Sequence, residues 1–187
     1  STAAHMSELA KKVNDGDTFA DKYFRLDADV DMSSVDAFGG IGVYNEKDLS
    51  QSFSGVFDGN NKTISNLVFL RGKYRGLFNQ VNGGTIKNLV IDGVSFADRG
   101  DSSYGGAAFV GYATGSARLE NLTAKGSQAF VGNHNMAGIA VKVQGNSFVY
   151  ACTNKLAITT PYTKVAGIVA FTQVSPAYYE DCVNEGT

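Results

Sequence analysis

A row of carboxylates is the first group of residues in this chain that could do chemistry. Asp27, Asp29 and Asp31 alternate with apolar residues. Carboxylate oxygens are the ligands that Ca²⁺ prefers, so one interpretation is a calcium site. The other interpretation, which we favour, is the solvent-facing side of a half-buried strand, because strands show the same alternation.

A row of basic residues is the second candidate. Arg71, Lys73 and Arg75 follow one another with period two, and Asp92 lies further along the chain. Polysaccharide lyases with β-helical folds need clustered aspartates beside lysine or arginine on one outer face. A basic row is more often a solvated strand face. We therefore assign no catalytic residue, and an autonomous polysaccharide lyase is the least favoured function.

The chain has only two cysteines and two histidines, so few residues could act as zinc ligands. The chain has no His-Glu-x-x-His motif, and His134 stands alone in a turn-like run at 132–135. Cys152 and Cys182 are predicted to be small buried hydrophobic residues. We expect two free, slowly reacting thiols, because in-register parallel strands aim both side chains in the same direction. The sequence implies no metal and no cofactor.

Arg99, Gly100 and Asp101, followed by Ser102, form the tetrapeptide that integrins recognise. The surrounding segment 97–106 is rich in Gly, Ser and Asp, which predicts an exposed loop. In such a loop the Arg and Asp charges project apart across a flexible Gly. Most chance occurrences of this tripeptide are inert turns, so both an integrin-type loop and an inert turn remain open.

The composition excludes several classes of protein. Hydrophobic residues make up 43% of the chain and charged residues 18%, which is enough apolar material to build a core. The net charge of −2 argues against a nucleic-acid partner, because neutralising phosphates needs a basic surface. No run of about 18 apolar residues is present, so membrane insertion is not expected.

The N-terminal residues are predicted to form a short helix that precedes the strands. Residues 1–6 resemble an expression-tag remnant and are left out of the fold prediction. Residues 7–13 are amphipathic, with Ser7 as the N-cap. Residues 24–32 then alternate strictly between apolar and polar, which predicts one half-buried strand. The residues predicted to point inward are Leu26, Ala28, Val30 and Met32.

An internal repeat is the most informative feature of the sequence. Gly-apolar-Phe motifs at 55–57 and 76–78 are each followed, after a short interval, by Ile-x-Asn-Leu at 64–67 and 86–89. Related motifs recur three more times at intervals of about 30 residues. We predict that the last residues of the second motif form one buried column: Leu67, Leu89, Leu122, Cys152 and Cys182.

Repeats of this length with short strands are typical of a β-solenoid, in which each coil lies on the one before. A β-sandwich is the competing interpretation and would require hairpins between antiparallel strands. Because the motifs recur in phase, we predict an all-β fold: a right-handed parallel β-helix of about five to six coils with a short N-terminal capping helix. This single domain over residues 7–187 is expected to be a segment of a larger protein, because no capping segment follows Cys182.

A family resemblance agrees with this fold. The segment 53–67, followed by Gly-Leu-Phe at 76–78 and Thr-Ile-Lys-Asn-Leu at 85–89, resembles GLUG-motif repeats. Such repeats occur in bacterial surface and secreted proteins and in the non-catalytic N-terminal regions of IgA-specific metallopeptidases. The resemblance implies a parallel β-helix on an exported bacterial protein. It implies no catalytic residue, because these motifs are structural.

The sequence therefore predicts a non-catalytic β-helical module of a bacterial cell-surface or secreted protein. Its function would be adhesion, ligand presentation or service as a spacer, with a surface protein or glycan as the partner. Further domains of the same polypeptide are expected. The alternative is an accessory, non-catalytic module of an exported peptidase or glycan-degrading enzyme.

Overall fold

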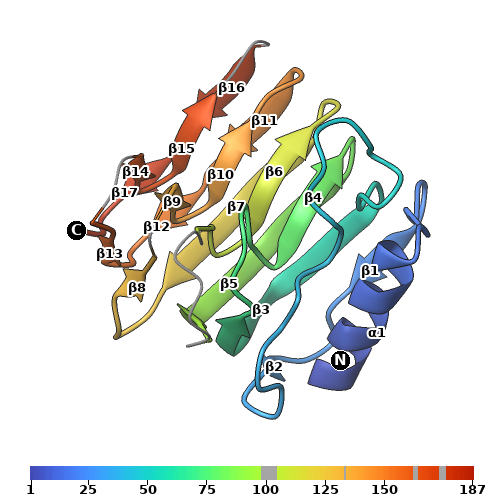
Figure 1. The fold of residues 1–187 in the computed structure, drawn as a ribbon, viewed down its shortest axis with the longest axis horizontal. Coiled ribbons are helices and arrows are strands. Elements are labelled where there is room, and N and C mark those ends of the chain that lie inside the picture. The colour runs from blue at the N-terminus through green and yellow to red at the C-terminus, as the bar shows by residue number, and fades with distance from the viewer. Residues whose placement is uncertain (98–104, 133, 162–163, 173–175) are drawn as a thin grey trace.

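The computed structural model describes residues 1–97, 105–132, 134–161, 164–172 and 176–187. The chain winds into a parallel β-solenoid of about five coils, with a helix at its N-terminal end. Figure 1 shows the strands of successive coils side by side, from α1 at one end of the stack to the C-terminus at the other. The predicted all-β solenoid is confirmed, and its right-handed sense stays a prediction.

Two sheets form the long faces of the solenoid, and every pairing found between the described strands is parallel. The nine strands of the main sheet are β1 (Tyr23–Arg25), β2 (Val30–Asp31), β3 (Val56–Phe69), β5 (Thr85–Phe96), β7 (Arg118–Lys125), β11 (Ser147–Tyr150), β12 (Thr153–Asn154), β16 (Ala177–Glu180) and β17 (Val183–Asn184). The second sheet contains β4 (Phe78–Asn82), β6 (Val110–Thr114), β10 (Ala140–Val143) and β15 (Val169–Thr172). Two short pairs complete the coils: β8 (Phe130–Val131) with β13 (Ile158–Thr159), and β9 (Met136–Ala137) with β14 (Val165–Ala166).

The repeated Asn of the sequence marks a corner of the coil. Asn88 and Asn121 lie on successive coils with φ angles of 53° and 51°, in the left-handed region that Asn tolerates better than most residues. Ala151 and Asp181 adopt the same conformation at the equivalent positions of the next two coils. The Asn121 amide donates a hydrogen bond to Asn88 Oδ1 at 3.0 Å. The same turn therefore repeats in four successive coils and redirects the chain at the same position in each.

The helix α1 (Ala3–Asn14) covers the N-terminal end of the core (Figure 1). Its N-cap is Thr2, whose hydroxyl accepts a hydrogen bond from the His5 N–H at 3.3 Å, and the predicted N-cap at Ser7 is wrong. The helix starts earlier because residues 3 and 6 also lie on its apolar face. Its buried residues are Ala3, Met6, Leu9, Ala10 and Val13.

The predicted strand over residues 24–32 is interrupted. The structure has β1 and β2 with a bend between them, and Ala28 in this bend is exposed rather than buried. Leu26, Val30 and Met32 are buried, as predicted. The bend between β1 and β2 matches a corner in the next coil. β1 and β2 pair with the long strand β3 on opposite sides of that corner.

The predicted core column needs one correction. Leu89 pairs with Leu122, and the register continues toward Cys152 and Cys182, but Leu67 pairs with Val94 instead of Leu89. The register of β3 against β5 shifts between Asp58 and Lys62, where β3 contains extra residues. The first Ile-x-Asn-Leu motif consequently lies further along its coil than the later ones. Leu67 is nevertheless buried.

Candidate functional site

The outer face of the main sheet carries two parallel columns in which most side chains are polar or aromatic. Strand register places each residue beside its counterpart on the next coil. The first column contains Tyr23, Val56, Thr85, Arg118, Phe148 and Tyr178. The second column contains Arg25, Asp58, Lys87, Glu120, Tyr150 and Glu180.

The first column ends in a stack of planar groups. The Arg118 guanidinium lies 5.2 Å from the centroid of the Phe148 ring. The Phe148 and Tyr178 rings are stacked, with centroids 4.7 Å apart and an interplanar angle of 18°. Tyr178 is 46% exposed, and Tyr150 in the neighbouring column is 41% exposed. This group, which we call the aromatic stack (Arg118, Phe148, Tyr150 and Tyr178), presents amphipathic rings to solvent on a rigid sheet.

The second column begins with alternating charges. Lys87 Nζ lies 3.8 Å from Asp58 Oδ2, and the Tyr23 hydroxyl donates a hydrogen bond to the same oxygen. Burial raises the pKa of Asp58, but the hydrogen bonds from Tyr23, the Asn60 N–H and Asn88 outweigh burial and hold that pKa below its ordinary value. Asp58 is therefore a fixed negative charge that ties three coils together.

The predicted carboxylate row does not assemble into a metal site. Asp29 Oδ1 accepts a hydrogen bond from the Thr63 N–H at 2.8 Å, and Asp31 Oδ1 accepts one from the Asn66 amide at 2.9 Å. Asp27 pairs with the N-terminal ammonium group. Each carboxylate is thus engaged by a different part of the chain. Among the residues that the structure describes, no group of three or more His, Cys, Asp or Glu could hold a metal ion.

The predicted basic row lies in a turn between β3 and β4, and its members have separate roles. Arg75 donates from Nη1 to the Gly39 carbonyl at 3.0 Å, and burial lowers the pKa of its guanidinium. Arg71 donates from Nε to the Ala97 carbonyl at 2.8 Å. Asp92 pairs with Lys125 at 3.2 Å. Asp92 is thus linked to the next coil, and these two hydrogen bonds of Arg71 and Arg75 go to backbone carbonyls.

The integrin-type tripeptide Arg99, Gly100 and Asp101 lies outside the residues that the structure describes. His134 is exposed, beside an undescribed position. The predicted integrin-type loop therefore stays a prediction.

An ion pair between a buried lysine of the second sheet and a partly exposed glutamate is a feature that the sequence did not indicate. Lys142 Nζ lies 2.7 Å from Glu46 Oε1, and the Lys142 side chain is only 2% exposed. The same ammonium group lies 5.2 Å from the Tyr112 ring centroid and 5.9 Å from that of Phe171. Tyr44, on the segment that carries Glu46, lies against Tyr112 with ring centroids 5.7 Å apart. Glu46 therefore fastens its loop over the outer face of this sheet.

We expect the Glu46–Lys142 pair to contribute a pH-dependent part of the stability. The hydrogen bond from Lys142 is the largest of the effects that lower the pKa of Glu46 from its ordinary value of 4.5. The contribution is therefore complete above pH 4.5 and is lost as the pH falls through the lowered pKa. Glu46→Gln should lower the free energy of unfolding at pH 7 by about 1–2 kcal/mol, discounted because the Glu46 side chain is 43% exposed.

Urea unfolding at several pH values measures this effect, and Glu185→Gln is the matched control. Glu185 pairs with Lys155 at 3.0 Å, but both side chains are about half exposed, so the control should change stability by less than about 0.5 kcal/mol. Equal effects of the two substitutions would contradict a larger contribution from the Glu46–Lys142 pair than from the exposed Glu185–Lys155 pair.

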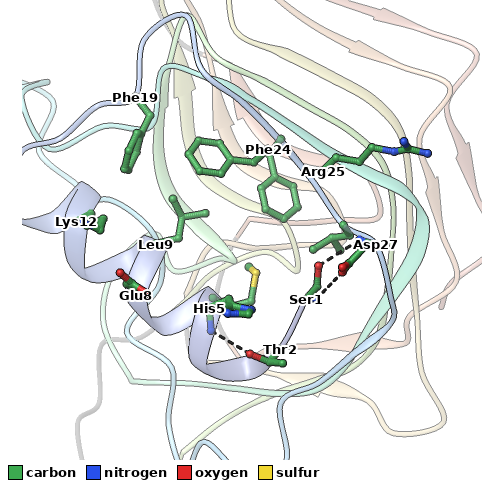
Figure 2. Close-up of a pocket in the computed structure, with 13 residues that line it drawn as sticks. Ser1, Thr2, His5, Glu8, Leu9, Lys12, Phe19, Phe24, Arg25 and Asp27 are labelled. Carbon is green, nitrogen blue, oxygen red and sulfur yellow. Dashed lines mark hydrogen bonds and ion pairs between the residues drawn. The ribbon is translucent and has the colours of Figure 1, made fainter.

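A cavity of about 510 Å³ lies between α1 and the first coil. Figure 2 shows Leu9, Phe19 and Phe24 facing one another around it, with Lys12 and Glu8 on the helix beside them. The Phe19 and Phe24 rings meet edge to face with centroids 5.0 Å apart. The cavity is large enough for a small apolar molecule. Several lining residues, Ser1, Thr2, His5 and Met6, belong to the segment predicted to be a tag remnant.

No helix among the described residues is long and apolar enough to cross a membrane. No protein-family model and no curated protein matches the chain. Among solved structures, the crystal structure of a putative immunoglobulin A1 protease from Bacteroides ovatus is similar to this chain at 16% sequence identity and a TM-score of 0.49. That similarity covers 98% of this chain and 73% of the other. At this identity and TM-score, the similarity carries no information about function.

Proposed function

We propose that this chain is a non-catalytic β-helical module of an exported bacterial protein that presents the outer face of its main sheet to a ligand. The observation that carries the proposal is the aromatic stack. Tyr150 and Tyr178 are large, exposed and held on strands, so binding would order few side chains. Arg118 and Glu120, which bond to each other at 2.5 Å, supply charged groups beside the rings. Aromatic and arginine side chains of this kind concentrate at binding surfaces.

The non-catalytic part of the proposal is supported by the separation of the candidate lyase residues. A lyase needs a carboxylate and a basic group that converge on one substrate. Asp92 pairs with Lys125 and Arg75 donates to the backbone of another coil, so Asp92 and Arg75, which the lyase interpretation would bring together, have different partners. The resemblance of residues 53–67 to GLUG-motif repeats supports a surface or secreted location.

A glycan array tests the proposed surface. If the protein binds, Tyr150→Ala combined with Tyr178→Ala should weaken binding at least about tenfold, because truncating an aromatic contact at an interface costs about 1–2 kcal/mol or more. Val131→Ala is the matched control, because Val131 is an exposed hydrophobic residue on β8, outside the main sheet. The control should bind like the unmodified protein.

The other outcomes separate the alternatives. Unchanged binding by the double variant would contradict the aromatic stack as the ligand surface. Binding to no glycan would favour the spacer role. Cleavage of an acidic polysaccharide would favour the lyase and contradict the non-catalytic assignment.

A further inference from the structure

The two cysteines lie next to each other on the last two coils. Tyr150 pairs with Glu180 and Thr153 pairs with Val183, so the register places Cys152 directly beside Cys182. Both thiols are free. Paired parallel strands lie about 4.8 Å apart, and a disulfide accepts Cα separations of about 4.4–6.8 Å. The Cα separation therefore allows a disulfide, and closing one requires the two parallel side chains to turn toward each other.

The two thiols differ in their access to solvent. Cys152 is completely buried, whereas Cys182 is only partly buried. Cys182 lines an open cavity of about 340 Å³ together with Ile168, Val169, Thr172 and Tyr179. In the 187-residue chain, in which Cys182 lies on the last coil, this cavity leads to Cys182, and Cys152 lies behind it on the preceding coil.

The two thiols also differ in their readiness to ionise. The interaction between the neighbouring thiols is the largest effect on both groups: it lowers the pKa of Cys182 below its ordinary value and, together with burial, raises the pKa of Cys152. The thiolate is the nucleophilic form of cysteine, so Cys182 is the thiol that reacts first. The sequence predicted two slowly reacting thiols, and the cavity argues instead for one accessible and one protected thiol.

We propose that Cys152 and Cys182 form a dithiol site that reacts with small-molecule disulfides and closes to a disulfide between the last two coils. In the first step the Cys182 thiolate attacks one sulfur of oxidised glutathione, and one glutathione leaves as a thiolate and takes up a proton. In the second step Cys152 loses its proton and attacks the Cys182 sulfur, and the second glutathione leaves. The protein gives up two electrons and two protons, and the small disulfide becomes two thiols.

The site does not depend on the proposed binding function, because it involves neither the aromatic stack nor its ligand. It would operate wherever the chain meets small-molecule disulfides. Its product would join β12 to β17 covalently and fasten the last coil to the stack.

The test incubates the folded protein with oxidised glutathione and follows the products by mass spectrometry and peptide mapping. The unmodified protein should lose both thiols, retain no glutathione and yield a linked Cys152–Cys182 peptide. Cys152→Ser should accumulate a stable glutathione adduct on Cys182, formed at a rate within about threefold of the first step in the unmodified protein. Cys182→Ser should react at least about 100-fold more slowly until it is denatured.

Two results would overturn the proposal. One is a glutathione adduct that persists on the unmodified protein without closing to the Cys152–Cys182 disulfide. The other is a Cys182→Ser variant that reacts in its folded state as fast as the unmodified protein. Cys152→Ala replaces Cys152→Ser if the buried hydroxyl prevents folding, and a cooperative melting transition establishes that each variant is folded.

Discussion

Replacing Leu89 with aspartate should remove most of the free energy that holds this chain folded. Leu89 is 1% exposed and lies between Lys62 and Leu122 on the neighbouring coils. The Leu89 Cβ already lies 2.6 Å from the place that a side chain on Gly59 would occupy, so the surroundings leave little room for water. An unpaired carboxylate there should cost at least about 4 kcal/mol. Urea unfolding monitored by circular dichroism measures the loss.

The adjacent residue provides the control. Val90 follows Leu89 on β5, points to the opposite face, and pairs with Thr63 and Thr123. Val90→Asp introduces the same charge on the same strand. Val90 is only partly buried, and it lies on the face of β5 where Asp92 pairs with Lys125. We expect this control to cost less than about 1 kcal/mol. Similar losses for the two variants would contradict the assignment of Leu89 to the core column.

The later coils could be predicted from the sequence because two requirements recur in each of them. An inward-facing apolar residue must follow a corner residue that tolerates a positive φ. Asn88 and Asn121 satisfy the corner requirement directly. Ala151 and Asp181 satisfy it at the same register position, although neither residue marks such a corner as clearly as Asn does. The spacing of the motifs, rather than the residue type at one position, therefore carried the correct prediction.

The first coils were predicted less well because their geometry departs from the repeat. The extra residues of β3 before Lys62 shift its register against β5, and a motif alignment without gaps cannot detect such a shift. The beginning of α1 was misplaced for a different reason. Residues 1–6 were set aside as a tag remnant, yet Ala3 and Met6 extend the apolar face of the helix.

The binding surface was only partly visible in the sequence. Tyr150 and Tyr178 lie on segments that the repeat had already aligned, so their placement on one face follows from register. The Glu46–Lys142 pair joins residues 96 positions apart, and Glu46 lies in an irregular segment between the first and second coils. The column of Gln80, Tyr112 and Lys142 on the second sheet does follow the repeat spacing. Alignment of these three positions could have indicated a polar column on the outer face. It could not have indicated that Glu46 pairs with Lys142 in this column.

Replacing Gly111 on β6 with alanine should strongly disrupt the second sheet. A Cβ on Gly111 would lie 1.7 Å from the Tyr74 carbonyl oxygen and 2.8 Å from the Asn79 carbonyl oxygen. Both are backbone atoms, so neither can rotate away. Tyr74 itself has a φ of 53°, an unusual value for a bulky residue, which indicates that its turn is held firmly against β6. We expect a loss of about 3 kcal/mol, the upper end of the cost of overpacking.

The same substitution should also disturb the aromatic side chains of this turn. Tyr74 and Tyr44 lie with ring centroids 4.2 Å apart, so displacing the Tyr74 backbone should weaken the near-ultraviolet circular dichroism of the tyrosines. Gly39→Ala is the matched control, because the nearest atom to a Cβ there is Leu70 Cδ1 at 3.7 Å, an ordinary contact. The control should keep the unmodified spectrum and unfold near the unmodified urea midpoint. If Gly111→Ala unfolded at the same urea concentration as Gly39→Ala, the close approach of the Tyr74 turn to β6 would be contradicted. The anchoring of the Glu46 loop would then depend on the Lys142 ion pair without support from the Tyr74–Tyr44 contact.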